Sequence, residues 1–305
     1  EGSKIQNGQI SSVALMDARS IAATAANKGY LTSATDLADI EYTHPKYFFD
    51  KAIYDRRVYN GVGKADPSVE IKFGPNIKDW PEMVPLTDNL LLKVASVIHD
   101  PVTTTDELIP SGETSSYRSN PLGLAEFTLS RKDPEYVGRA KAIQAVEKVR
   151  EAGECMGKAF PEVKEVMHAI KEKFEDVCGS NTGVGSTIYA VKPGDGSARE
   201  QAASCQKVLG GWANIAKEYA TKRYRSNLIN WGMLPFVIDK DFDFDNDDYV
   251  FIPGVKDAVK NKTEVIKAYV VNKNFAEIEL RLGELTDDER QIITDGCLIN
   301  YYKYN

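Results

Sequence analysis

Hydrophobic and polar residues follow two spacings along most of the chain, one typical of strands and one typical of helices. Short runs rich in β-branched and aromatic residues predict strands at 90–98, 187–191, 213–216, 234–238, 249–252, 264–271 and 275–281. Helical spacing of apolar residues predicts helices at 134–152, 161–177, 199–209, 220–230 and 286–302. Because strands are interleaved with helices, the pattern favours an α/β layered domain rather than a helix bundle.

The first 80 residues do not follow this alternation. One helix is expected over 12–28, rich in Ala and Ile and ended by Gly29. From 36 to 81, Tyr, Phe, Pro, Gly and charged residues mix without sustained periodicity, which is uncommon inside a compact domain. We therefore expect a helical and irregular arm, with a domain boundary near 65–80.

The composition limits the classes of partner. The chain has 305 residues, of which 42% are hydrophobic, enough to build a substantial core. It has no apolar stretch of membrane-spanning length and no signal-peptide pattern at its start, so we expect no membrane partner and a cytoplasmic location. The net charge of −7 argues against broad nucleic-acid affinity, which depends on neutralising phosphates.

Neither cysteine nor histidine spacing indicates a metal site. The four cysteines form no C-x-x-C pair and lie in mostly apolar or helical surroundings, so we expect buried thiols. The acidic run 239–248 has the alternation of a calcium loop. However, Asn246 stands at the obligatory glycine position and Ile252 at the position of the bidentate glutamate, which favours an acidic rim instead.

The stretch Gly194-Asp195-Gly196-Ser197-Ala198-Arg199-Glu200-Gln201-Ala202 is the most informative in the chain. It joins an expected strand to an expected helix, and its glycines permit a tight turn at the helix N-terminus. Free N–H groups and the positive end of the helix dipole favour an anion there. Arg199 adds a guanidinium that matches a carboxylate. Taken alone, Ser197 also fits a plain N-cap, with Glu200 completing a capping box.

A second polar cluster follows the expected strand that ends near Ile98. It contains Thr105-Asp106, and Arg118 stands twelve positions after the aspartate (118 − 106 = 12). Irregular segments beside strand ends are where α/β folds keep their ligand sites. For either residue alone, a turn or cap at Asp106 and a solvated Arg118 are the simpler interpretations.

Four blocks in this order resemble the C-terminal swivel domain of the aconitase family. They are Thr105-Asp106, Arg118, the Gly194–Ala202 turn, and the segment Asn227-Leu228-Ile229-Asn230-Trp231-Gly232-Met233-Leu234-Pro235. The resemblance implies an α/β swivel domain, with a mixed sheet flanked by helices, over 81–305. It also implies that 1–34 is the end of an upstream third domain and that 35–80 is a linker.

The resemblance assigns roles to individual residues. Ser197 matches the serine that, as an alkoxide, removes a proton from the carbon next to a substrate carboxylate, and Asp106 matches an active-site aspartate. Arg118 and Arg199 match arginines that hold substrate carboxylates, as bidentate guanidinium–carboxylate geometry allows. The implied reaction is the reversible dehydration of a hydroxy polycarboxylic acid.

Two positions depart from the family pattern. Ala198 stands where a second serine is usual, which removes a hydroxyl contact to substrate but leaves the backbone N–H. Glu107 replaces a frequent histidine. Both departures bear on substrate identity and suggest a hydratase-like branch.

The resemblance further implies a [4Fe–4S] cluster in the complete enzyme, held by three cysteines from upstream domains. The sequence has no such cysteine pattern, so no cluster ligand is assigned to this chain. The expected partners are the cluster-bearing upstream domains and a small polycarboxylate, and this chain alone is expected to be inactive.

Two alternatives stay open from the sequence. Instead of being a portion of an aconitase-like hydro-lyase, the chain could be a separate small subunit of an isopropylmalate-isomerase-like enzyme. The long opening arm argues against this alternative. The other alternative is a non-catalytic, RNA-binding aconitase relative, against which the acidic composition counts.

Overall fold

The computed structural model describes residues 14–36, 43–57, 60–70 and 72–304, and the chain divides into two compact units, 1–72 and 73–305. The first unit contains α1 (Ala18–Ala26), a 3₁₀ turn (Ala34–Asp36) and α2 (Lys51–Arg57). Helix α1 begins only at Ala18, because Asp17 is its N-cap and accepts hydrogen bonds from two backbone N–H groups of the first turn. The expected helix over 12–28 is therefore too long, and its residues 12 and 13 lie outside the described residues.

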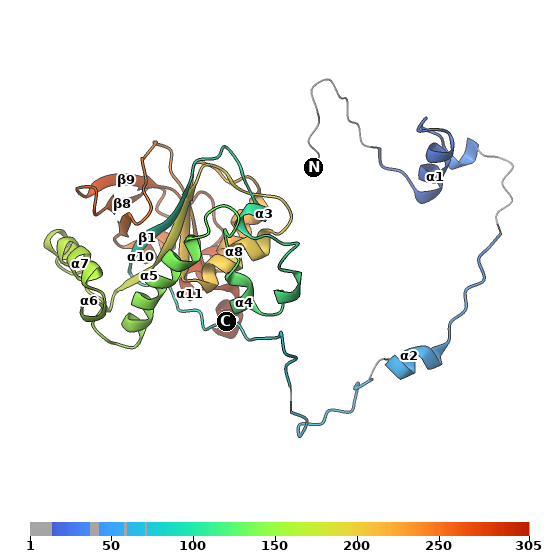
Figure 1. Cartoon of the computed structure of the whole chain (residues 1–305), viewed down its shortest axis with the longest axis horizontal. Helices are drawn as coiled ribbons and strands as arrows, with labels where there is room; N and C mark the ends of the chain where they lie inside the picture. Colours follow the sequence, from blue (N-terminus) through green and yellow to red (C-terminus); the bar gives the residue numbers. More distant parts are fainter. Residues whose placement is uncertain (1–13, 37–42, 58–59, 71, 305) are drawn as a thin grey trace. The chain divides into compact units, whose positions relative to one another are not determined.

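The second unit is the α/β layered domain that the sequence predicts (Figure 1). Its strands are β1 (Asn89–Ile98), β2 (Thr103–Thr104), β3 (Thr182–Ala190), β4 (Pro193–Asp195), β5 (Gly211–Ala216), β6 (Leu234–Val237), β7 (Tyr249–Ile252), β8 (Ile266–Val270) and β9 (Ala276–Leu280). Its helices are α3 (Thr105–Leu108), α4 (Pro121–Ala125), α5 (Tyr136–Glu151), α6 (Met156–Ala159), α7 (Pro161–Lys173), α8 (Arg199–Val208), α9 (Lys222–Asn230), α10 (Val255–Lys260), α11 (Asp287–Asp295) and α12 (Leu298–Tyr304).

Seven strands form one mixed sheet in the order β6-β5-β3-β1-β7-β8-β9. The first four are parallel to one another, whereas β7, β8 and β9 are joined through antiparallel pairs. The carboxyl ends of β1 and β3 therefore meet at the same edge of the sheet, which is the edge where open α/β sheets bind ligands.

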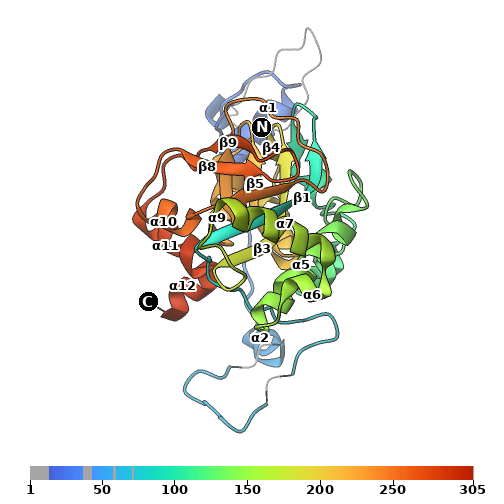
Figure 2. The same cartoon turned by 90° about the vertical axis from the view of Figure 1, so that its left-hand side faces the viewer.

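Helices cover both faces of this sheet, and β1 shows why. Leu90, Leu92 and Val94 pack into one core with residues of α10 and α11, while Leu91 packs with α5 and α7. Alternate side chains of a strand point to opposite faces, so a nearly continuous apolar run indicates a strand buried on both sides. Figure 2 shows α5, α6 and α7 together on one side of the sheet, with α10 and α11 on the other.

The C-terminal helical stretch differs from its prediction. The expected capping box is present at Thr286 and Glu289, but the helix ends at Gly296 and α12 starts as a separate helix. Gly296 has φ +95°, and a Cβ there would lie 2.1 Å from the carbonyl oxygen of Val84. The close approach of the 84–85 backbone thus requires glycine and breaks the helix, which the local pattern does not reveal.

The expectation of buried thiols is right for two cysteines and wrong for two. Cys205 and Cys297 are buried in the core, where burial raises the pKa of the Cys205 thiol to about 12. Cys155 and Cys178 are exposed, because they lie in the loops that flank α6 and α7 rather than on a helix face. Within the described residues, no helix has the length and apolarity needed to cross a membrane.

Candidate functional site

The loops that carry the two motif clusters leave neighbouring parallel strands and then pair with each other. Strand β2 follows β1, strand β4 follows β3, and the two form a small parallel sheet in which Thr103 pairs with Pro193 and Thr104 with Asp195. Helix α3 begins directly after β2, and helix α8 begins four residues after β4, so the two helix starts lie side by side (Figure 1). This pairing brings the segment of Asp106 next to the turn of Ser197.

Two glycines make the close approach possible. Gly196 has φ +134°, and a Cβ at this position would lie 2.2 Å from the hydroxyl oxygen of Thr105. Gly194 has φ +96°, and its Cβ would lie 2.3 Å from the ring of Tyr224. The hydroxyl of Thr221, which caps α9, donates to the Gly194 carbonyl oxygen at 3.2 Å. The turn is thus packed between the start of α3 and the start of α9.

The N-cap interpretation of Ser197 is wrong in this structure. The N-cap of α8 is Ala198, with no side-chain hydrogen bond to the helix start, and Ser197 is exposed. Within the described residues, the Ser197 hydroxyl makes no hydrogen bond. The first N–H groups of α8 therefore have no side-chain cap, as an anion-binding helix start requires.

Arg199 is half-buried and lacks an acidic partner. Its Nε is buried without a hydrogen-bond acceptor, and no ion pair joins its guanidinium to a carboxylate in the described part of the chain. A buried guanidinium N–H without an acceptor is costly, and a ligand oxygen that accepts a hydrogen bond from it would remove that cost.

Glu200 does not complete a capping box either. Its carboxylate accepts a hydrogen bond from the indole N–H of Trp231 at 3.0 Å. The Trp231 ring packs against Trp80, with ring centroids 4.4 Å apart. The first turn of α8 is therefore tied to the end of α9 and to the segment that precedes β1.

That preceding segment also holds the loop of Arg118. The Asn76 side-chain amide donates to the carbonyl oxygen of Ser116 at 3.1 Å, and the Lys78 backbone N–H donates to that of Ser119 at 2.9 Å. These two hydrogen bonds lie on either side of Arg118, which is exposed and has no ion pair among the described residues. Arg118, Trp80, Glu200 and Gln201 line a small cavity of about 30 Å³, so the Arg118 loop lies beside the first turns of α8.

Asp106 is held by neighbours that sequence inspection did not identify. Its carboxylate accepts from Arg131 at 2.5 Å and from the backbone N–H of Ser111 at 3.2 Å. Arg131 also bonds Glu113 at 2.6 Å. Arg131 lies 25 residues from Asp106 in an irregular connection, where no periodicity marks it as a partner.

Glu107, which stands where the family often has a histidine, has a structural role. It forms a capping box with Thr104, the N-cap of α3, and its carboxylate also lies 3.4 Å from Lys132. Although partial burial opposes this effect, the hydrogen bonds from Thr104 lower the pKa of Glu107. Glu107 thus stays ionised and fixes the start of the helix that carries Asp106.

The structure brings the segments of Asp106 and Ser197 together at the carboxyl edge of the sheet and the Arg118 loop beside α8, whereas the segment Asn227–Pro235 leads into the amino end of β6. No hydrogen bond or ion pair among the described residues joins the side chains of Asp106, Arg118, Ser197 and Arg199 to one another. Arg118 and Ser197 are exposed, Arg199 is half-buried, and neither arginine has an acidic partner among the described residues. A guanidinium without an acidic partner can bind a carboxylate, and a serine oxygen can act as a base when nearby cations and N–H groups stabilise it.

The described residues do not fit the ligation of an iron–sulfur cluster. Over 14–36, 43–57, 60–70 and 72–304, no group of three His, Cys, Asp or Glu side chains is placed to hold a metal ion. Cys205 and Cys297 lie in the apolar core, and Cys155 and Cys178 are exposed on loops. We therefore derive no step of a mechanism through a cluster on this chain.

Comparison with known proteins gives a family match within the second unit. Residues 173–241 match the model of the aconitase C-terminal domain. This range contains the Ser197 turn and the Asn227–Pro235 segment but neither Asp106 nor Arg118. The match confirms the resemblance to the aconitase family that the motifs predicted.

Aconitate hydratase A from Rickettsia bellii is a curated relative, 30% identical over 131 residues. The aligned region covers 40% of this chain and 15% of that protein, so the chain spans a small part of its relative. A solved 3-isopropylmalate dehydratase from Methanocaldococcus jannaschii is also similar in structure. It has a TM-score of 0.43 and 22% identity, and the match covers 70% of this chain and 93% of that one.

Proposed function

We propose that this chain, which carries an aconitase C-terminal domain at 173–241, supplies the serine base and the carboxylate-binding arginines of an aconitase-like hydro-lyase. The proposed reaction is the reversible dehydration of a hydroxy polycarboxylic acid. One observation carries the proposal most directly. The β2–β4 pair and the contact of Gly196 with Thr105 place the loops of Asp106 and Ser197 side by side, at the sheet edge where α/β folds bind ligands.

In this proposal Ser197 is the proton acceptor. Its Oγ takes the proton from the carbon next to a substrate carboxylate, and the electron pair left on carbon forms the double bond as hydroxide leaves the neighbouring carbon. In the reverse direction Oγ returns the proton. A serine is too weak a base in water, so it needs cations and N–H dipoles nearby. The uncapped start of α8 and the guanidinium of Arg199 are the groups that can provide them.

The two arginines and Ala198 would bind the substrate. Arg118 and Arg199 have no acidic partner among the described residues, so each can take one carboxylate in a bidentate arrangement. Ala198 offers only its backbone N–H, because the hydroxyl of the usual serine is missing. Asp106, fixed by Arg131 and the N–H of Ser111, would serve as a rigid acceptor for a substrate hydroxyl.

The complete site requires more than this chain. Similarity to the aconitase family implies an iron–sulfur cluster in the complete enzyme, where it would supply a Lewis acid for the leaving hydroxyl. We propose that other domains hold this cluster. In the same proposal, residues 1–34 are the end of such a domain and 35–80 are a linker to the swivel domain, 81–305. The last part of that linker, residues 73–80, groups with the second compact unit.

Binding to the purified 305-residue chain tests the substrate half of the proposal. Tricarballylate, a tricarboxylate without a hydroxyl group, is titrated by calorimetry into the wild-type chain and into R118A, R199A and R223A. Arg223 is exposed on α9 and is the matched control. Loss of one charge-assisted pair, worth about 1.5–3 kcal/mol, predicts about 10- to 150-fold weaker binding for the two site variants. Equal affinities in all four proteins, or no binding by the wild type, would reject the assignment.

A further inference from the structure

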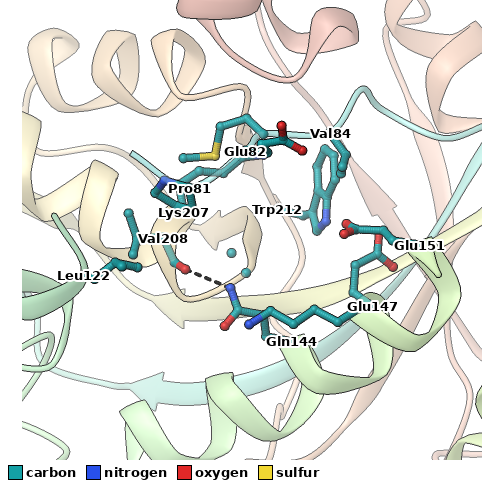
Figure 3. Close-up of a pocket in the computed structure, with 14 residues that line it drawn as sticks. Pro81, Glu82, Val84, Leu122, Gln144, Glu147, Glu151, Lys207, Val208 and Trp212 are labelled. Carbon is teal, nitrogen blue, oxygen red and sulfur yellow. Dashed lines mark hydrogen bonds between the residues drawn. The ribbon is translucent and has the colours of Figure 1, made fainter. Parts of the chain in front are cut away.

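A second cavity lies at the other edge of the sheet, where α8 ends and β5 begins (Figure 3). It has a volume of about 150 Å³. One wall is a single face of α5, formed by Gln144, Glu147 and Glu151, and another is the segment 81–84. The third wall is the stretch from Lys207 to Trp212. The Ser197 turn lies at the opposite end of α8, so this cavity is separate from the proposed catalytic site.

Lys207 is the unusual residue of this cavity. It is only 6% exposed, and its Nζ has no hydrogen-bond partner within the described residues. The Nζ lies 3.7 Å from the centre of the Trp212 ring, and this cation–π contact partly offsets the lost hydration of the ammonium group. Burial lowers the pKa of Lys207 to about 8. An amine buried without an acceptor is costly, so an acceptor supplied by a ligand would relieve that cost.

The cavity also presents carboxylates that do not neutralise Lys207. The Glu147 carboxylate is already bound by Arg150 at 2.6 Å and by the backbone N–H of Val184 at 2.7 Å. Glu151 and Glu82 are exposed at the mouth and form no ion pair among the described residues. Partial burial, followed by repulsion from Glu147, raises the pKa of Glu151. Figure 3 shows the carboxylates of Glu82 and Glu151 on the Trp212 side of the cavity.

We propose that this cavity binds a small zwitterionic α-amino acid. The ligand carboxylate would accept from Lys207 Nζ, and its ammonium group would lie between Glu82 and Glu151. Its short side chain would face Val208 and Leu122, which also line the cavity.

The lining contains cations, Lys207 and Lys148, as well as the carboxylates of Glu82 and Glu151, so it disfavours ligands with a single charge. A plain anion would face the carboxylates at the mouth, and a plain amine would leave Lys207 without an acceptor. A neutral carbonyl compound would leave both carboxylates unpaired. A ligand with both charges can pair with Lys207 at one end and with Glu82 and Glu151 at the other, and the volume restricts it to a few heavy atoms.

The test is calorimetric titration of the whole chain with glycine, alanine and valine, with acetate and methylammonium as single-charge probes. The proposal expects binding of the amino acids and at least about tenfold weaker binding of both single-charge probes. K207M and E151Q should each weaken amino acid binding about 10- to 150-fold, the effect of losing one charged hydrogen bond. K141M is the matched control, because Lys141 is exposed on α5 and does not line the cavity. It should bind as the wild type does.

Affinity for glycine should also fall as pH rises from 7 to 8.5, because Lys207 loses its proton near pH 8. The other charged groups that line the cavity are Glu82, Glu147, Lys148 and Glu151, and partial burial raises the pKa of Glu151. Because Glu151 is exposed, E151Q keeps the test valid even if K207M fails to fold. Absence of amino acid binding at 10 mM, acetate binding as tight as glycine, or unchanged affinity in E151Q would each overturn the proposal.

Discussion

Replacing Gly196 by alanine tests whether the contact between the two loops is as tight as the structure indicates. The new Cβ would lie 2.2 Å from Thr105 Oγ1, whereas ordinary contact begins at 3.4 Å, so the loops must separate by about 1.2 Å (3.4 − 2.2). Thr105 is only 3% exposed and lies in the first turn of α3, so its side chain has little room to rotate away. Overpacking of this kind costs about 1–3 kcal/mol. The φ of +134° adds about 1–3 kcal/mol for a residue with a Cβ.

The total expected loss for G196A is therefore about 2–6 kcal/mol in the free energy of unfolding, measured by urea denaturation followed by circular dichroism. G112A is the control, because Gly112 lies in the exposed connection after α3 and nothing is within 4 Å of its Cβ. It should change stability by less than about 0.5 kcal/mol. In the double variant G196A/T105A the clashing hydroxyl is gone, so about 1–3 kcal/mol should be recovered relative to the sum of the single variants. A G196A protein as stable as G112A, or no coupling in the double variant, would refute the proposed contact.

Three further predictions concern the supports of the site and the second cavity. W80A should destabilise the chain by about 2–4 kcal/mol by removing the ring that packs on Trp231, and should weaken tricarballylate binding in calorimetry, because the Arg118 loop loses a neighbour. Y224F should cost about 1–3 kcal/mol in urea denaturation, because the buried side-chain amides of Gln206 and Asn214 lose their shared acceptor at 2.9 and 2.7 Å. Because the pKa of Lys207 is lowered to about 8 in the folded chain, the stability cost of its charge is full below pH 8 and is relieved as pH rises toward 10.5. K207M should thus be more stable than wild type at pH 7, by an amount that shrinks by about 1.4 kcal/mol per pH unit between 8 and 10 in urea denaturation; a difference independent of pH would contradict the lowered pKa.

The elements of the sheet and their order could be predicted because each has a strong local pattern. The apolar run of β1 and the helical spacing of α5 and α8 depend on residues a few positions apart, and the structure confirms them. The break at Gly296 depends instead on the backbone of Val84, more than 200 residues away, so the sequence pattern of the last helix could not reveal it.

The candidate site also combines features that local sequence predicts with contacts that it does not predict. The helix start at Arg199 could be predicted from Gly194 and Gly196 and from the strand that precedes them. The β2–β4 pair, the ion pair of Arg131 with Asp106 and the stack of Trp80 on Trp231 join segments that are distant in sequence. Such contacts have no periodicity, so only the folded chain reveals them. The β2–β4 pair brings two of the four motif segments, those of Asp106 and Ser197, to one edge of the sheet.

The most direct test of the central claim is hydrogen exchange between solvent and substrate in the complete enzyme that contains this chain. The enzyme is incubated in D₂O with its hydroxy acid, and deuterium at the carbon next to the carboxylate is followed by mass spectrometry for wild type and S197A. If Ser197 Oγ takes the proton, exchange should fall by about 10²- to 10⁴-fold in S197A, while substrate affinity changes by less than about twofold. Exchange in S197A at the wild-type rate would show that another group is the base and would contradict the account.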